Sequence, residues 1–340
     1  MNFTLMIYFN TEFTSTVKWS GRAYYTQVHF DNLDISDGII QITGHRGSPV
    51  SLKKILFNTK SSLYFQIIKA LSFYYLCSGA PITLCKMELT SGTGQNEVET
   101  DFLQPFEKQL RPHQIMTTNK MEKLFSFQSN EQLFLTGIIY YIKATQDSSF
   151  ELFWRSFNSL YSIISPSGTD FNKLRTIRQF VESHRVNFSD TLTHISTDTA
   201  QDIRKLRIRE YILNNWPSTS IGQTRSFVKT IKRFSDIRII SVFKDTLCYR
   251  IDALKYHGLE RDVNDHIMQC QILNQTDDVE LLCFYVLKYS YFIRNKYFHA
   301  EKAHPFFILK KTSETEEMLK ISIIFEHFLA DLIRCNILYL

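Results

Sequence analysis

Three residues near the C-terminal end of the chain combine the groups that phosphodiester chemistry needs. Arg294, Asn295 and His299 follow an apolar run over residues 279–293, which is typical of a core helix. An arginine guanidinium holds a phosphate through a planar fork of donors. A histidine imidazole moves protons near neutral pH. A cation, an amide and an imidazole at the end of a buried helix therefore suit chemistry on a phosphodiester.

The Arg-x4-His spacing does not identify a site by itself, because the chain contains it twice. The second copy runs from Arg261 to His266, in a polar segment after Gly258 where a solvated loop or a short helix explains it. The first copy ends an apolar helix, which we expect Pro305 to terminate. The setting therefore favours the copy at residues 294–299.

On the predicted helix, Asn295 and His299 lie one turn apart on one face, and Arg294 lies one step round. The three side chains fall within a sector of about 140°. A structural interpretation stays open: Arg294 pairs with a carboxylate such as Glu301, while His299 caps helix carbonyls. His304 fits a surface or supporting position better than a catalytic one.

The elements that must position these residues indicate an α+β protein. Residues 1–128 form a β-containing N-terminal domain, with strands expected at 25–30, 38–43 and 82–89 and a helix at 61–77. Residues 129–340 form an all-α domain, in which a polar, helix-rich insertion spans about 168–275.

The helical domain begins with a predicted αα-hairpin and ends with a capped helix. Residues 130–145 and 149–165 form the hairpin, because large apolar residues such as Phe150, Trp154 and Phe157 recur at helical spacing. Residues 313–316 (Ser-Glu-Thr-Glu) have the pattern of a capping box for the last helix.

This arrangement resembles the HEPN superfamily, whose members carry Arg-x4-His, often with Asn, Asp or His second. Arg294, Asn295 and His299 match those positions. The hairpin segment Phe150–Asn158 is similar to the first two helices of the HEPN unit, above all in Apea-like members. The resemblance covers about 129–165 and 278–338, and it leaves the N-terminal domain and the insertion unexplained.

The resemblance implies a metal-independent endoribonuclease that needs no cofactor and acts as a homodimer with a composite active site. His299 would be the base or acid, Arg294 would hold the phosphate, and Asn295 would orient either group. The usual setting of such an architecture is a toxin or antiviral-defence effector, with an antitoxin or activating partner at the N-terminal domain. Some HEPN proteins have lost catalysis and only bind, so a scaffold for RNA, a nucleotide or a protein is the alternative.

Positive charge is concentrated in the predicted insertion. Residues 201–240 hold nine basic and three acidic side chains. The net charge of this segment is therefore +6, which exceeds the net charge of +5 for all 340 residues. A helix predicted over 221–235 places four cations on one face, opposite an apolar face. Such a stripe suits an RNA backbone, although a solvated amphipathic helix has the same pattern. The candidate RNA-binding residues are Arg225, Lys229, Lys232, Arg233, Arg204 and Arg207.

Composition favours a cytoplasmic protein. The six cysteines form no CxxC pair and sit mostly in apolar surroundings, so we expect reduced thiols and no metal site. The N-terminus lacks the basic start of a signal peptide. Lys69 interrupts the most apolar stretch, at 63–85, so we expect a core helix and strand there and no membrane contact. A third interpretation is a helical interaction protein with an incidental Arg-His pair.

Overall fold

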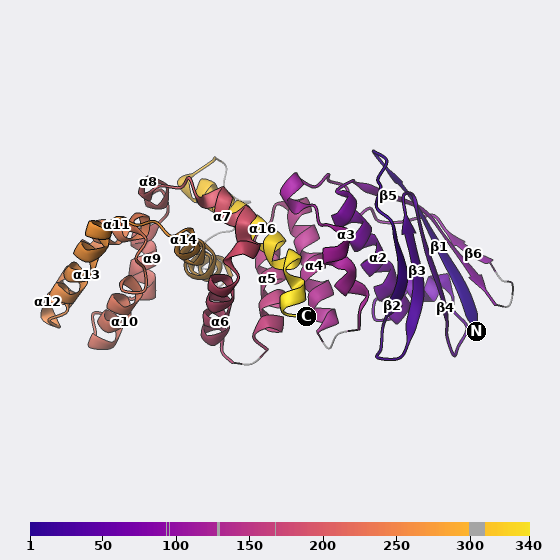
Figure 1. Ribbon diagram of the computed structural model, residues 1–340, viewed down its shortest axis with the longest axis horizontal. Coiled ribbons are helices and arrows are strands. Elements are labelled where there is room, and N and C mark those ends of the chain that lie inside the picture. The colour runs from indigo at the N-terminus through magenta and orange to yellow at the C-terminus, as the bar shows by residue number, and fades with distance from the viewer. Residues whose placement is uncertain (93, 95, 128–129, 167, 299–309) are drawn as a thin grey trace. The chain divides into compact units, whose positions relative to one another are not determined.

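The computed structural model (Figure 1) contains two compact units. Unit 1 comprises residues 1–173 and 329–340, and unit 2 comprises residues 174–328. The residues described are 1–92, 94, 96–127, 130–166, 168–298 and 310–340. A six-stranded sheet precedes a long helical region, so the α+β class is confirmed. The limits of these units differ from those of the domains predicted at 1–128 and 129–340, and the predicted domain limits remain a prediction.

Unit 1 is built on an antiparallel sheet with the strand order β2-β3-β4-β1-β5-β6 (Figure 1). Side chains of β1 alternate, so that Phe3, Leu5, Ile7 and Phe9 are buried while their neighbours are not. The strands are β1 (Asn2–Thr11), β2 (Trp19–Tyr24), β3 (Phe30–Ser36), β4 (Ile39–His45), β5 (Ile82–Ser91) and β6 (Asn96–Glu99).

The strands predicted at 38–43 and 82–89 are confirmed as β4 and β5, but the strand predicted at 25–30 is wrong. Residues 25–29 form the loop that joins β2 to β3, and Phe30 is the first residue of β3. The Thr26 hydroxyl accepts hydrogen bonds from the amides of Val28 and His29, which competes with strand pairing. The backbone amide of Tyr25 also donates to His29 O at 3.1 Å, which closes the turn.

Helix α2 (Ser62–Ser78) packs against the sheet and confirms the helix predicted at 61–77. The Ser61 hydroxyl caps its start, and Gly79 ends it with φ 70°, a conformation that favours glycine. The ring of Tyr74 lies 4.8 Å from that of Phe9 on β1. Aromatic and aliphatic side chains from the helix and the sheet thus form one core.

The predicted αα-hairpin is confirmed as α4 (Glu131–Asp147) and α5 (Phe150–Ile164). The two helices approach closely at Gly137, where an added Cβ would lie 2.8 Å from Leu160 Cδ2. The Ser156 hydroxyl donates to the Gly137 carbonyl at 2.7 Å across this contact. The other helices of unit 1 are α1 (Leu52–Phe57), η1 (Pro112–Gln114), α3 (Thr118–Met121), η2 (Glu122–Phe125) and η7 (Asn336–Leu338).

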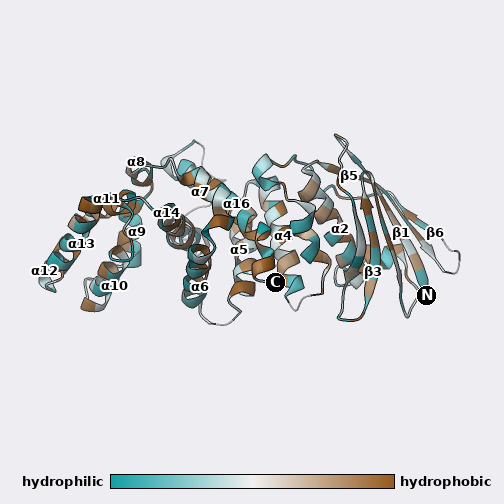
Figure 2. Ribbon diagram, viewed as in Figure 1, coloured by the Kyte–Doolittle hydropathy of each residue, from teal (hydrophilic) through white to brown (hydrophobic). Residues whose placement is uncertain are grey.

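Unit 2 is entirely helical in its described residues, and Figure 2 shows both hydrophilic and hydrophobic residues on helices such as α10 and α13. Helix α6 begins in unit 1 and continues into unit 2, and α16 runs from unit 2 into unit 1. The elements are α6 (Asp170–Ser183), η3 (Arg185–Phe188), α7 (Ser189–Ile195), α8 (Ala200–Arg204), α9 (Ile208–Asn215), α10 (Ile221–Ile231), α11 (Ile237–Thr246), η4 (Leu247–Tyr249), α12 (Ile251–Tyr256), α13 (Glu260–Leu273), α14 (Asp278–Cys283), η5 (Phe284–Tyr289), α15 (Ser290–Phe298) and α16 (Ser313–Arg334).

Helix α16 confirms the predicted last helix, but its cap lies one residue earlier than the predicted box. The Thr312 hydroxyl accepts from Thr315 N at 3.3 Å, and the Thr315 hydroxyl accepts from Thr312 N at 2.8 Å. The Thr315 hydroxyl therefore accepts the hydrogen bond that the sequence pattern predicted for the side chain of Glu316. No described helix is long and apolar enough to cross a membrane.

Candidate functional site

Arg294 and Asn295 lie side by side on α15, and both side chains are partly buried. Arg294 Nη1 donates to Asn295 Oδ1 at 2.9 Å, and the guanidinium carbon lies 5.9 Å from the centre of the Tyr291 ring. This contact turns one side of the planar guanidinium toward Asn295. His299 lies outside the described residues, and so do Glu301, His304 and Pro305, so the geometry covers two of the three predicted catalytic residues.

The helix that carries Arg294 follows a π-helical segment. Helix α14, the π-helix η5 and α15 succeed one another without a break from Asp278 to Phe298. The Ser290 hydroxyl, fully buried, donates to Tyr285 O at 2.7 Å and so bonds five residues back. π-Helical turns are rare and occur frequently at functional sites. The apolar run predicted at 279–293 is therefore helical, but its middle is not an α-helix.

A buried polar network anchors this segment within unit 2. The Tyr289 hydroxyl donates to Glu317 on α16, and Arg207 Nε donates to the same carboxylate at 2.7 Å. Arg207 Nη1 also contacts Glu314 at 2.6 Å. Burial acts to lower the pKa of Arg207, but the charge and the hydrogen bond of Glu317, together with Tyr289 and Glu314, outweigh burial and raise the pKa. Burial, followed by the same carboxylate, raises the pKa of Tyr289.

Three of the six candidate RNA-binding residues have carboxylate partners, and those of Arg204 and Lys232 are exposed while that of Arg207 is buried. Arg207 belongs to the network just described, and Arg204 Nη2 lies 2.7 Å from Asp245. Neither partner was evident from the sequence, because Asp245 and Glu317 lie 41 and 110 residues away. The positive charge of Arg207 is thus compensated within unit 2.

The other four candidates lie on α10 or just after it. The apolar face is confirmed, since Phe227, Val228, Ile231 and Phe234 are all buried. The helix ends at Ile231, earlier than the predicted end at 235, and the next residues form a turn. Arg225 and Lys229 are exposed, Lys232 Nζ lies 2.6 Å from Asp262, and Arg233 is half-buried. The predicted stripe therefore divides into a helix surface and a turn.

The second Arg-x4-His copy lies on α13, which is a regular helix of 14 residues rather than a loop. The Arg261 side chain is 93% exposed, with Asp265 at 3.7 Å. His266 Nε2 lies 2.9 Å from the backbone oxygen of Phe234. One residue faces solvent and the other is bound to the backbone of a neighbouring segment, so this copy does not form a joint site.

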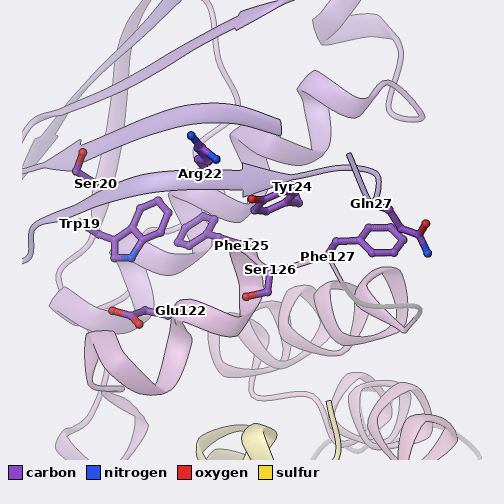
Figure 3. Close-up of a pocket in the computed structure, with 9 residues that line it drawn as sticks. All are labelled: Trp19, Ser20, Arg22, Tyr24, Gln27, Glu122, Phe125, Ser126 and Phe127. Atoms are coloured by element: carbon purple, nitrogen blue, oxygen red, sulfur yellow. The ribbon is translucent and has the colours of Figure 1, made fainter. Parts of the chain in front are cut away.

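Unit 1 contains a pocket of about 680 Å³ beside strand β2, at the edge of the sheet. Figure 3 shows Trp19 next to Phe125, and the two rings stack at 4.0 Å between centres. Phe127 is 37% exposed and adds a third aromatic wall. The lining residues are Trp19, Ser20, Arg22, Tyr24, Gln27, Glu122, Phe125, Ser126 and Phe127. Its volume falls in the range of small-molecule sites, and it mixes rings with polar groups.

The cysteines offer no evident site. All six are free, and Cys77, Cys270, Cys283 and Cys335 are buried. Burial raises the pKa of the Cys77, Cys283 and Cys335 thiols to about 12, which keeps them protonated and unreactive. Among the described residues, no three His, Cys, Asp or Glu side chains are grouped as metal binding requires.

Comparisons with protein-family models, with curated proteins and with solved structures found no match to this chain. The candidate site therefore stands on its residues and their surroundings alone.

Proposed function

We propose that the protein is a metal-independent endoribonuclease whose site comprises Arg294, Asn295 and His299. The observation that carries the proposal is the pairing of the Arg294 guanidinium with Asn295, on a helix held by a buried network. The HEPN-like motif supplies His299 five residues after Arg294. A guanidinium donor fork and an imidazole together supply the groups that in-line displacement at phosphorus requires.

The proposed reaction uses the 2′-hydroxyl of RNA as the nucleophile. One imidazole accepts the hydroxyl proton while the oxygen attacks the adjacent phosphorus. The bond to the 5′-oxygen breaks, and that oxygen leaves with a proton from an acid. The products are a 2′,3′-cyclic phosphate and a 5′-hydroxyl end. Arg294 donates to the non-bridging oxygens as their charge grows, and Asn295 keeps the guanidinium in place.

A homodimer would supply the acid and the base from two copies of His299, in one composite cleft. This is the arrangement that the HEPN resemblance implies, and it makes activity depend on protein concentration. A cytoplasmic toxin or antiviral effector is the proposed setting, with the N-terminal domain, residues 1–128, as the place where an antitoxin or activator binds.

The decisive experiment uses the purified full-length chain and RNA in buffer with EDTA. We expect cleavage that leaves 2′,3′-cyclic phosphate ends, and no cleavage of DNA or of 2′-O-methyl RNA, because neither has the nucleophile. The His299→Ala variant should be inactive while its circular dichroism and melting temperature stay unchanged. His266→Ala is the matched control from the other Arg-x4-His copy. Equal cleavage by wild type and His299→Ala would rule out this site.

The second candidate function is a scaffold that binds a nucleotide without cleaving RNA. The aromatic pocket of unit 1 favours it, because rings such as Trp19 and Phe127 can stack a base while Arg22 meets a phosphate. Trp19 is suited to report binding, since Trp154 and Trp216 are buried. Nucleotide titration should quench fluorescence in the wild type and not in Trp19→Phe. No quenching by any ribonucleotide would remove this candidate.

A further inference from the structure

Four cationic side chains gather in unit 2 where α6, the turn after α10 and the π-helix η5 meet. Arg178 Nη2 donates to the backbone oxygen of Arg233 at 3.5 Å, which joins α6 to that turn. The Arg178 guanidinium lies 5.6 Å from the centre of the Phe234 ring, and that ring lies 5.9 Å from Phe284. The cation cluster consists of Arg175, Arg178, Arg233 and Lys288.

The charges of this cation cluster are poorly compensated. Arg178 Nε lies 2.6 Å from Glu182, but no carboxylate of a described residue lies within ion-pair distance of Arg175, Arg233 or Lys288. Burial, followed by the charges of Arg233 and Arg178, lowers the pKa of Lys288 to about 8. Burial and the charge of Arg178 also lower the pKa of Arg233. The fold therefore holds together charges that repel one another.

The nearby acids are already engaged or too few to balance the cluster. Glu182 is bound by Arg178, and the Glu280 carboxylate accepts from the amides of Ser235 and Asp236. Cys283, next to the π-helix, is a buried thiol whose pKa is raised to about 12. Grouped cations without carboxylates are costly in a partly buried place, and an anionic ligand would remove that cost.

We propose that the cation cluster binds a backbone phosphate of single-stranded RNA, next to the site on α15. The inference rests on the proposed function for its choice of ligand. Three guanidinium groups and an ammonium offer donors in several directions, as a phosphodiester's two free oxygens require. Lys288 lies six residues before Arg294 on the same continuous helical segment. The cluster would hold the substrate while α15 acts on it.

Binding is tested apart from cleavage with a fluorescent 2′-O-methyl RNA, which the proposed reaction leaves intact. Lys288→Gln and Arg233→Gln should each weaken binding about 5- to 10-fold and make the salt dependence shallower by about 0.7 in its log–log slope. Arg261→Gln removes an exposed cation of the same unit and is the control, with binding unchanged within about twofold. This outcome stands even if the protein cleaves no RNA.

Thermal unfolding separates a ligand site from a structural role. A cation that stabilises the fold lowers the melting temperature when it is removed. Lys288 is repelled by its neighbours, so Lys288→Gln should melt at or above the wild-type temperature while it binds RNA less tightly. A lower melting temperature with unchanged RNA binding in both variants would overturn the proposal.

The pH dependence adds a readout specific to Lys288. Its ammonium is charged below pH 8 and loses its charge as the pH rises through about 8. RNA affinity should therefore fall between pH 7 and pH 9, and Lys288→Arg should flatten that fall because arginine stays charged. Competition by millimolar pyrophosphate as strong as that by RNA of equal charge would point to a free anion instead. Identical pH profiles for wild type and Lys288→Arg would also count against the cluster.

Discussion

The two Arg-x4-His copies have the same spacing but different surroundings. On α13, Arg261 faces solvent, and His266 binds a backbone oxygen of the segment after α10. On α15, Arg294 is partly buried and held by Asn295, directly after a π-helix. The difference shows that a short motif indicates a site only where neighbouring groups hold its side chains. An exposed arginine samples many orientations, whereas a held guanidinium presents its donors in one.

The sharpest test of this comparison is to remove each arginine in turn. Arg294→Ala should lower kcat for RNA cleavage by about 10²- to 10³-fold, because a donor to the growing phosphate charge is lost. Arg261→Ala should leave kcat within about twofold, since its side chain is exposed. Initial rates at saturating RNA measure both. Equal losses of kcat in the two variants would mean that the two copies do not differ in function and that the active site lies elsewhere.

The anchoring network should matter more for stability than the ion pair on α13. Glu317→Gln removes a buried carboxylate from Arg207 and should lower the free energy of unfolding by about 3 kcal/mol. Asp265→Asn affects only a pair with exposed Arg261 and should change it by less than about 0.5 kcal/mol. Urea unfolding followed by circular dichroism gives both values. A stable Glu317→Gln variant would mean that α15 is held by other contacts.

His266 should be a structural residue, in contrast to His299. His266→Ala removes the contact with Phe234 O and should lower the free energy of unfolding by about 1 kcal/mol. Its cleavage rate should equal that of the wild type at a temperature where both are folded. A loss of cleavage with an intact fold would instead give the α13 copy a direct part in function.

The smallest effect concerns the surface of α10, where Lys229 has no carboxylate partner among the described residues and Lys232 is paired with Asp262. Lys229→Gln should make the salt dependence of RNA binding shallower by about 0.7 in its log–log slope. Lys232→Gln should change it less, because Asp262 already neutralises that ammonium at 2.6 Å. Fluorescence anisotropy over a series of salt concentrations resolves the two. Unchanged slopes in both variants would assign α10 to an ordinary solvated surface.

Most of the elements that local patterns predicted are present in the structure. The helix at 61–77 and the hairpin of α4 and α5 were evident because their apolar residues recur at helical spacing and small polar residues mark their ends. The error at 25–30 had a local cause as well, because strand-forming residue types surround a threonine whose hydroxyl stabilises a turn. Strand β1 went unnoticed, although its alternation of Phe3, Leu5, Ile7 and Phe9 is regular.

Long-range partners explain why the site was only partly predictable. The buried role of Arg207 depends on Glu314 and Glu317, more than 100 residues later. The cation cluster joins Arg178 and Arg233 to Lys288, and the sequence shows only a lysine inside an otherwise apolar run. The motif on α15 was evident from composition and order, but nothing local indicates a π-helical turn ahead of it.

The π-helix η5 sets the rotation and the axial position of the helical residues that follow it. A π turn closes over five residues where an α turn closes over four, so it amounts to one extra residue in the helix. Deleting one residue within Phe284–Tyr289 would let the segment become an ordinary α-helix while its buried neighbours keep their places. If the segment became α-helical without such a deletion, every later side chain would turn by about 100° and shift by about 1.5 Å along the axis. Arg294 would point in a new direction without any change to the motif itself. The direction of its guanidinium therefore depends on the helical geometry upstream, at Phe284–Tyr289.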